Sequence, residues 1–167
     1  MTSQRSLIQF VGAVGLFLIV MWWGFNHYSA DILNFFQIES TYVISFTEIS
    51  LEVRVADEAA EWQQGLSGVT ALGEREGKLF IFPETGDYGM WMKDMLIPID
   101  IMWLDENFTI VHIEHNVSPD TYPKTFRSPV PARFVLETTA EFARAFNLQV
   151  GSKATLPSFI VPRDLQI

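Results

Sequence analysis

Cysteine is absent from this sequence of 167 residues. Its absence excludes disulfide bonds, catalysis by a thiolate and the cysteine-rich class of zinc sites. Basic residues are also scarce, with 11 Lys and Arg against 20 Asp and Glu and a formal net charge of -9. Because nucleic acids are bound by basic surfaces, this deficit argues against a nucleic-acid partner.

Common catalytic and nucleotide-binding motifs are missing as well. The sequence contains no phosphate-binding loop, no dinucleotide fingerprint and no G-x-S-x-G motif around a serine. We therefore expect no cofactor. A binding domain is favoured over an enzyme, although the motifs alone do not decide between the two.

A long hydrophobic run is present near the N-terminus, where residues 7–25 carry no charge. A helix of that length spans roughly 28 Å, close to the thickness of the hydrocarbon core of a bilayer. We predict an uncleaved transmembrane helix within residues 1–28, with membrane lipid as a partner. The alternative is a cleaved signal peptide, but no small-x-small cleavage site follows the run. Aromatic residues suited to the membrane interface lie at its end: Trp22, Trp23, Phe25 and Tyr28.

The orientation of this predicted anchor follows from charge. Arg5 precedes the run, and no Lys or Arg follows it until Arg54. The positive-inside rule then places the N-terminus in the cytoplasm and the rest of the chain in the periplasm or outside the cell. Residues 29–40 are the expected juxtamembrane connector, and residues 41–167 the expected soluble domain.

Short strands dominate the pattern of the expected soluble domain. Apolar and polar residues alternate over 49–55, as is typical of a half-buried strand, and further strands are expected at 42–46, 78–82, 88–93, 97–104, 108–115, 132–137 and 153–156. Two short helices are expected, over 58–64 with Gly65 at its end and over 139–146 with a capping box formed by Thr138 and Glu141. The fold class is therefore α+β: a compact, mainly antiparallel, barrel-like β domain.

Several segments resemble the DUF192 family, also called UPF0127. They are EWQQGL at 61–66, EGKLFIFP at 76–83, WMKDMLIPID at 91–100, NV at 116–117 and PARFVLE at 131–137. The resemblance implies a compact, mainly β fold, often behind a signal sequence or an anchor, and implies no reaction. This chain departs from the family pattern at Trp62, Ser67, Val69 and Asp94, which favours a binding or structural use of the domain.

Charged residues interrupt the apolar stretch 88–105, and they suggest a polar site. If residues 88–93 and 97–104 form a hairpin, Trp91 lies opposite Asp100 and Lys93 lies diagonal to Asp100, all on one face. Together with Glu137, these residues could bind a small polar ligand or a carbohydrate, with the Trp91 ring stacking on a sugar or a cation. The alternative is a structural ion pair that fixes the register of the strands.

Two other chemistries have less support. His112, Glu114 and His115 are close in sequence, but on one strand His115 points away from the other two, so we expect no metal site there. Asp100, Glu114 and Glu137 could supply paired carboxylates for glycoside hydrolysis, but the sequence gives no distance between them.

The leading functional hypothesis is a membrane-anchored, extracytoplasmic binding or accessory domain, docked as a subunit on a larger membrane protein complex. The second hypothesis is a domain that acts on a small ligand or a carbohydrate through Trp91, Lys93, Asp100 and Glu137.

Overall fold

The computed structural model describes residues 40–166 of the chain. Among them no helix is long and apolar enough to cross a membrane. The predicted transmembrane run and its aromatic residues (Trp22, Trp23, Phe25 and Tyr28) lie outside the described range.

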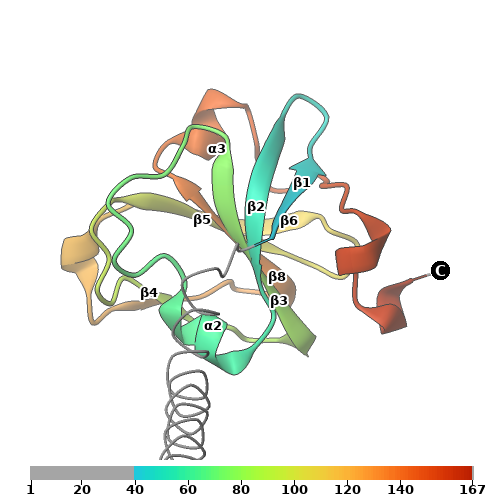
Figure 1. Ribbon diagram of the computed structural model, residues 1–167, viewed down its shortest axis with the longest axis horizontal. Coiled ribbons are helices and arrows are strands. Elements are labelled where there is room, and N and C mark those ends of the chain that lie inside the picture. The colour runs from blue at the N-terminus through green and yellow to red at the C-terminus, as the bar shows by residue number, and fades with distance from the viewer. Residues whose placement is uncertain (1–39, 167) are drawn as a thin grey trace, which may run out of the picture. The chain divides into compact units, whose positions relative to one another are not determined.

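Six strands form one twisted sheet in the order β1-β2-β3-β8-β5-β6 (Figure 1). Neighbouring strands are antiparallel except for β2 and β3, which are parallel and are joined by a long crossover. These strands are β1 (Thr41–Ser45), β2 (Ser50–Ala56), β3 (Glu76–Gly86), β5 (Ile99–Leu104), β6 (Ile110–Val117) and β8 (Ala132–Thr139).

Both faces of this sheet are buried. Alternate residues of β3 and β8 point to opposite faces, so that Leu79 and Leu136 belong to one apolar cluster while Phe80 and Val135 belong to the other. All six residues of β5 are buried. Burial of a large apolar side chain contributes about 1.5–3 kcal/mol, so the two clusters are the main source of stability.

Short helices lie at well-separated places around the sheet (Figure 1). The crossover between β2 and β3 contains α2 (Ala59–Gln64), which begins with a capping box between Glu58 and Glu61 and ends at Gly65. This confirms the helix expected there. The second helix, α3 (Phe142–Ala145), follows β8. Three 3-10 turns complete the described chain: η1 (Pro119–Thr121), η2 (Ser158–Ile160) and η3 (Arg163–Leu165).

The predicted capping box of the second helix is wrong. Thr138 stays in β8, and α3 begins after Glu141, whose side chain makes no capping hydrogen bond. Asn147, just after the helix, adopts the left-handed conformation that is common at helix ends, with φ 54°. The first turn of α3 is capped instead by a residue from a distant strand, described below.

The predicted hairpin of residues 88–104 is also wrong. Residues Met90–Trp91 form β4, which pairs with β7 (Thr125–Phe126) in a separate two-stranded sheet. Strand β5 already pairs with β6 and β8 on its two edges and has no edge left for β4. The 88–91 segment packs over the sheet instead, where the Trp103 indole donates a hydrogen bond to the Tyr88 carbonyl at 2.9 Å.

The main sheet is not closed into a barrel, contrary to the barrel-like expectation. Its two edge strands are β1 and β6. The expected last strand, 153–156, is reduced to two isolated bridges, Thr109 with Lys153 and Ser45 with Thr155, which connect the start of β6 to the end of β1. The coarser prediction of a mainly β domain with two short helices is confirmed.

Candidate functional site

A pocket of about 250 Å³ lies between α2 and the β4 segment, and we refer to it as the α2 pocket. Apolar and aromatic side chains form most of its wall, and a few polar groups are set among them. Its lining residues are Ala59, Trp62, Gln63, Gln64, Gly65, Leu66, Ser67, Phe80, Gly89, Met90, Trp91, Met95 and Glu137.

Hydrogen bonds fix two walls of the α2 pocket to each other. The Ser67 hydroxyl donates to the Lys93 carbonyl at 2.9 Å, and the Gly68 N–H donates to the Asp94 carbonyl at the same distance. The Trp62 indole N–H is bound to the Ala56 carbonyl at 3.0 Å, which fixes its ring. Such a wall is preformed rather than assembled by a ligand.

Glu137 is the one ionisable residue among the described residues that line the α2 pocket. It lies on β8 with 3% of its surface exposed. Burial raises the pKa of its carboxyl to about 8, although the positive charge of Lys78, opposite it on β3, lowers the pKa in part. At neutral pH the carboxyl is therefore mostly protonated.

One oxygen of this carboxyl, Glu137 Oε2, is buried and has no hydrogen-bond partner within the described structure. Buried polar atoms are nearly always hydrogen-bonded, because leaving one unpaired costs about 1–3 kcal/mol. The unpaired oxygen is therefore the feature of the pocket that most needs an explanation.

Gly65 leaves room beside this oxygen. It adopts φ +50°, and a Cβ at this position would lie 3.6 Å from Glu137 Oε2 and 3.2 Å from Phe80 Cζ. Any larger side chain at this position would be strained and would fill the space next to the carboxyl. The absence of a side chain at Gly65, at the end of α2, thus leaves space beside the Glu137 carboxyl.

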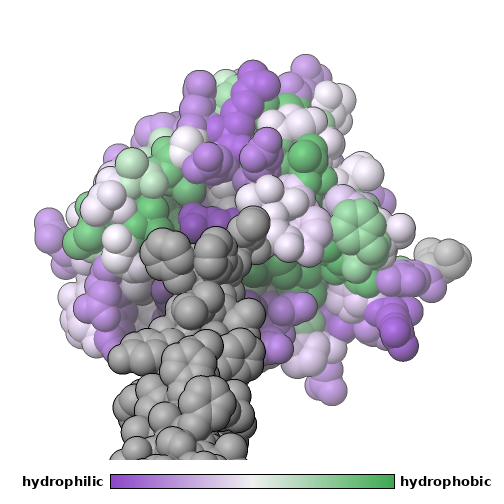
Figure 2. Space-filling model, in the orientation of Figure 1, coloured by the Kyte–Doolittle hydropathy of each residue, from purple (hydrophilic) through white to green (hydrophobic). Residues whose placement is uncertain are grey.

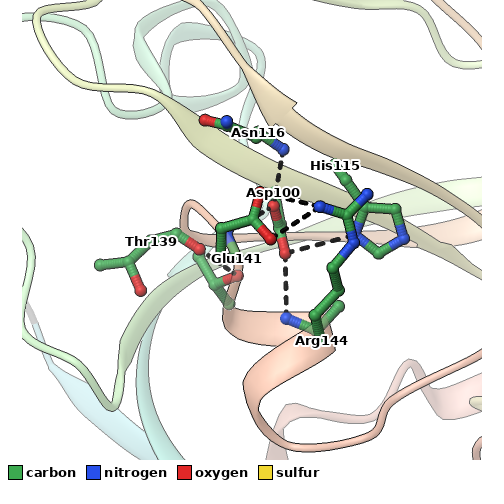
Figure 3. A network of polar contacts seen from close by, with 8 residues as sticks. Asp100, His115, Asn116, Thr139, Glu141 and Arg144 are labelled. Carbon is green, nitrogen blue, oxygen red and sulfur yellow. Dashed lines mark hydrogen bonds and ion pairs between the residues drawn. The ribbon is translucent and has the colours of Figure 1, made fainter.

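A second buried acid, Asp100, occupies a very different environment (Figure 3). Its Oδ1 accepts hydrogen bonds from the backbone N–H groups of Asn116 (2.8 Å) and Glu141 (3.0 Å), and its Oδ2 accepts one from the N–H of Ala143 (2.9 Å). Asn116 and Glu141 have positive φ angles of 48° and 66°. Asp100 therefore caps α3 and stabilises two left-handed residues, and this is a structural role.

His115 lies at the edge of the same network. Its Nδ1 is 3.6 Å from Asp100 Oδ2 and has no hydrogen-bond partner within the described structure. The other histidine of this strand, His112, points elsewhere and lies 3.2 Å from Glu114. The described residues contain no group of three or more potential metal ligands.

The four residues singled out from the sequence do not meet at one place. Trp91 and Glu137 both line the α2 pocket. Asp100 pairs with Thr138, the neighbour of Glu137, and so points to the opposite face of the sheet. Lys93 is exposed and is not among the lining residues; its carbonyl accepts the hydrogen bond from the lining residue Ser67. Of the three candidate hydrolase carboxylates, Glu137 alone is in the pocket.

The α2 side of the pocket was missed at the sequence level. Trp62, Gln63 and Gly65 were assigned to a helix, its end and a family-like segment but not to a site, although the helix contains a Trp beside two amides. Glu137, by contrast, was named among the candidate residues at the sequence level, as the last residue of the segment 131–137 that resembles the family.

Much of the visible molecular surface is a mixture of apolar and polar side chains (Figure 2). Large apolar residues that are exposed include Trp91, at 46%, and Phe159, at 73%. Trp91 is the one of these that also lines the α2 pocket, so its exposed ring forms part of the pocket entrance.

Comparison with known families supports the resemblance noted above. The model of DUF192, described as an uncharacterized ACR, matches residues 42–156. No curated protein matches this sequence.

Two solved structures share the fold. A protein from Sinorhizobium meliloti 1021, described as a candidate transcription regulator, has 24% identity and a TM-score of 0.68, over 71% of this chain and 95% of its own. A protein of unknown function from Novosphingobium aromaticivorans DSM 12444 has 24% identity and a TM-score of 0.63, over 69% of this chain and 83% of its own. At this identity the likeness concerns the fold alone.

Proposed function

This chain belongs to the DUF192 family, and we propose that its domain, residues 41–167, is a binding module that takes a small organic molecule into the α2 pocket. The observation that carries the proposal is the buried, unpaired oxygen of Glu137 on the floor of this pocket. A ligand with a suitable polar group would satisfy it.

The size and lining of the pocket support a small ligand. Ligand sites are commonly apolar clefts of about 300–1,000 Å³ with a few polar groups that fix orientation. At about 250 Å³ the α2 pocket lies slightly below this range. It suits a compact molecule better than a nucleotide or another large cofactor.

The residues that line the pocket favour binding of a ligand without catalysis. Acid-base catalysis commonly uses two groups with different protonation states, as in glycoside hydrolysis. Among the described lining residues Glu137 is the one group that titrates. A single acid in an apolar pocket is suited to recognition.

Ligand-observed NMR with a library of small fragments and the full chain in non-ionic detergent would test this. We expect hits that Glu137→Gln weakens at least tenfold. Glu114→Gln, which changes a carboxylate of the same sheet outside the pocket, is the matched control and should leave the hits unchanged. An absence of hits, or hits that ignore Glu137→Gln, would overturn the proposal.

The location of the module is a second part of the proposal. The uncharged run at 7–25 and the following aromatic residues favour a single-pass anchor with the N-terminus in the cytoplasm, the domain in the periplasm or outside the cell, and other membrane subunits as partners. Membrane fractionation and protease accessibility of the intact cell would test the anchor and its orientation. Co-purification from mild detergent would test the partners, and a strictly monomeric product would count against them.

A further inference from the structure

We propose that the ligand of the α2 pocket is a small protonated amine, whose N–H group pairs with Glu137 while its apolar part lies against the aromatic wall. This inference rests on the function proposed above and names the chemical class of the ligand. It makes that proposal more specific. The inference about the amine can be wrong while the proposed binding function remains correct.

The first support is the kind of hydrogen bond that the floor of the pocket lacks. When ionised, the Glu137 carboxylate is an acceptor only, and its Oε2 then has no donor within the described structure. A protonated amine supplies both an N–H donor and a compensating charge. Charge-assisted hydrogen bonds of this kind are roughly twice as strong as neutral ones.

The second support is the wall around that carboxyl. Trp62, Phe80 and Trp91 line the pocket together with the thioethers of Met90 and Met95. Aromatic faces attract cations, and Trp is the best of them. The same side chains bury an alkyl chain well, so the wall fits an amine with a short apolar substituent.

Charge also argues against an anionic ligand. An anionic ligand would meet Glu137 and a domain that carries net negative charge, since all 20 acidic and 10 of the 11 basic residues lie from Asp31 onward. Like charges brought together without compensation disfavour binding. The long-range field of an acidic domain instead favours the approach of a cation.

The remaining alternative is a neutral ligand. The direction in which affinity changes with pH distinguishes a neutral ligand from a cation. The pKa of Glu137 is raised to about 8 by burial. A cation requires the carboxylate, so its binding releases a proton and strengthens as the pH rises toward 8. A neutral acceptor, such as a carbonyl, requires the protonated carboxyl and therefore binds more weakly above pH 8.

The charged groups around Glu137 do not reverse this direction. Lys78 on β3 is opposite Glu137, and its positive charge already acts to lower the pKa. On the other side of Glu137, β5 presents Ile101. Glu61 of α2 is directed to the backbone N–H groups of Asp57 and Glu58. No residue of α2 or β4 among the pocket lining carries a charge.

Four small probes of matched size would test the inference: n-butylammonium, tetramethylammonium, 1-butanol and butyrate. Their binding to the full chain, labelled with 5-fluorotryptophan and kept in non-ionic detergent, would be followed by fluorine NMR between pH 6.0 and 9.0. An alkylammonium stays charged over this range, because its pKa is close to that of Lys, about 10.4.

We expect n-butylammonium to bind at least tenfold more tightly at pH 8.5 than the other three probes. Its affinity should rise about tenfold or more between pH 6.5 and 8.5. Glu137→Gln should remove both the preference and the pH dependence, while Glu114→Gln should leave both intact.

Four other results would overturn the inference. If 1-butanol binds as well as n-butylammonium, or if affinity for the amine falls as the pH rises, the ligand is neutral and the binding module survives without this specificity. If tetramethylammonium binds as well as n-butylammonium, the N–H pairing is wrong. If no probe binds at any pH and the fragment library also gives no hits, the proposed function itself fails.

Discussion

Two buried acids on neighbouring strands, Asp100 and Glu137, show how differently the same chemical group can be used on the two faces of one sheet. Asp100 accepts three backbone hydrogen bonds, all within 3.0 Å. Glu137, which is opposite the next residue of β5, has an oxygen with no partner and a raised pKa. The Asp100 carboxyl therefore has a structural role. The Glu137 carboxyl has an oxygen that is available to hydrogen-bond with a ligand.

The largest effect that would test this contrast is expected from removal of the Asp100 carboxyl, which accepts three hydrogen bonds. Asp100→Ala would leave three backbone N–H groups without their acceptor, and we expect a loss of about 5 kcal/mol in the free energy of unfolding. Urea denaturation followed by tryptophan fluorescence would measure it. Asp100→Asn, which keeps the shape and loses the charge, should show a smaller loss. If Asp100→Ala lost less than about 1 kcal/mol, the structural role assigned to Asp100 would be wrong.

The pH dependence of stability tests the other acid. In the unfolded chain Glu137 titrates near its ordinary pKa of 4.5, and in the folded chain near 8. The folded state thus holds a proton that the unfolded state releases between these values. The contribution of Glu137 is fully present below pH 4.5 and declines by about 4 kcal/mol as the pH rises to 8.

Denaturation of the wild type and of Glu137→Gln at pH 5 and pH 8 would measure this decline. The variant cannot titrate at this position, so its stability should fall less between the two pH values, and it should exceed the wild type at pH 8. Parallel pH profiles for the two proteins would show that Glu137 is not titrating in the way its burial implies.

A smaller effect is expected from closing the space beside Glu137. Gly65→Ala places a methyl group near Phe80 and the unpaired oxygen at an unfavourable φ, and we expect a loss of about 2 kcal/mol and loss of ligand binding. Gly68→Ala is the matched control, since Gly68 also has a positive φ (+77°) but a Cβ added there would meet no atom within 4 Å. If both variants bound ligand equally, the space at Gly65 would be irrelevant to binding.

The smallest change in stability is expected at the entrance of the pocket. Trp91 is 46% exposed, so Trp91→Ala should alter the free energy of unfolding by about 0.5 kcal/mol. Its ligand affinity should nevertheless fall several-fold, because an aromatic face is lost. Leu96→Ala, at a position that is 59% exposed and outside the pocket lining, serves as the control for both measurements.

The elements that the sequence predicted are those with local signals. Alternation over 49–55 predicted β2, and a residue suited to a left-handed end, Gly65, predicted the end of α2. These patterns depend on residues close in the chain. The turn between β5 and β6 is local in the same sense, because the Asn107 N–H donates to Asp105 Oδ1 two residues before it.

Features that depend on distant residues were not predictable in this way. Strand β4 pairs with β7, which follows it by more than 30 residues, and no local pattern marks either strand as the partner of the other. The cap of α3 comes from Asp100, 41 residues before Glu141. A Thr and a Glu at the right spacing therefore suggested a capping box that the chain does not use.

The candidate site was predictable in part for the same reason. A charge in an apolar stretch identified Asp100 as unusual, and Glu137 was named with it as a candidate, but their division between two faces follows from the register of β5 and β8. The hairpin prediction placed Trp91 beside Asp100, whereas tertiary packing places it in the pocket of Glu137. The sequence thus indicated which residues are unusual, but it did not indicate which residues lie next to them in the fold.

The place of β8 in the sheet has a consequence for how the protein is made. This strand lies between β3 and β5, yet it is the last of the six to be synthesised, and it pairs Gly77 with Thr138. Until it emerges from the ribosome, the β1-β2-β3 and β5-β6 groups each present an unpaired inner edge. Long-range pairing of this kind slows folding and exposes such edges to wrong partners. The nascent chain therefore depends on protection of these edges until residue 139 has been added, and any truncation before that point should leave two separate half-sheets prone to aggregation.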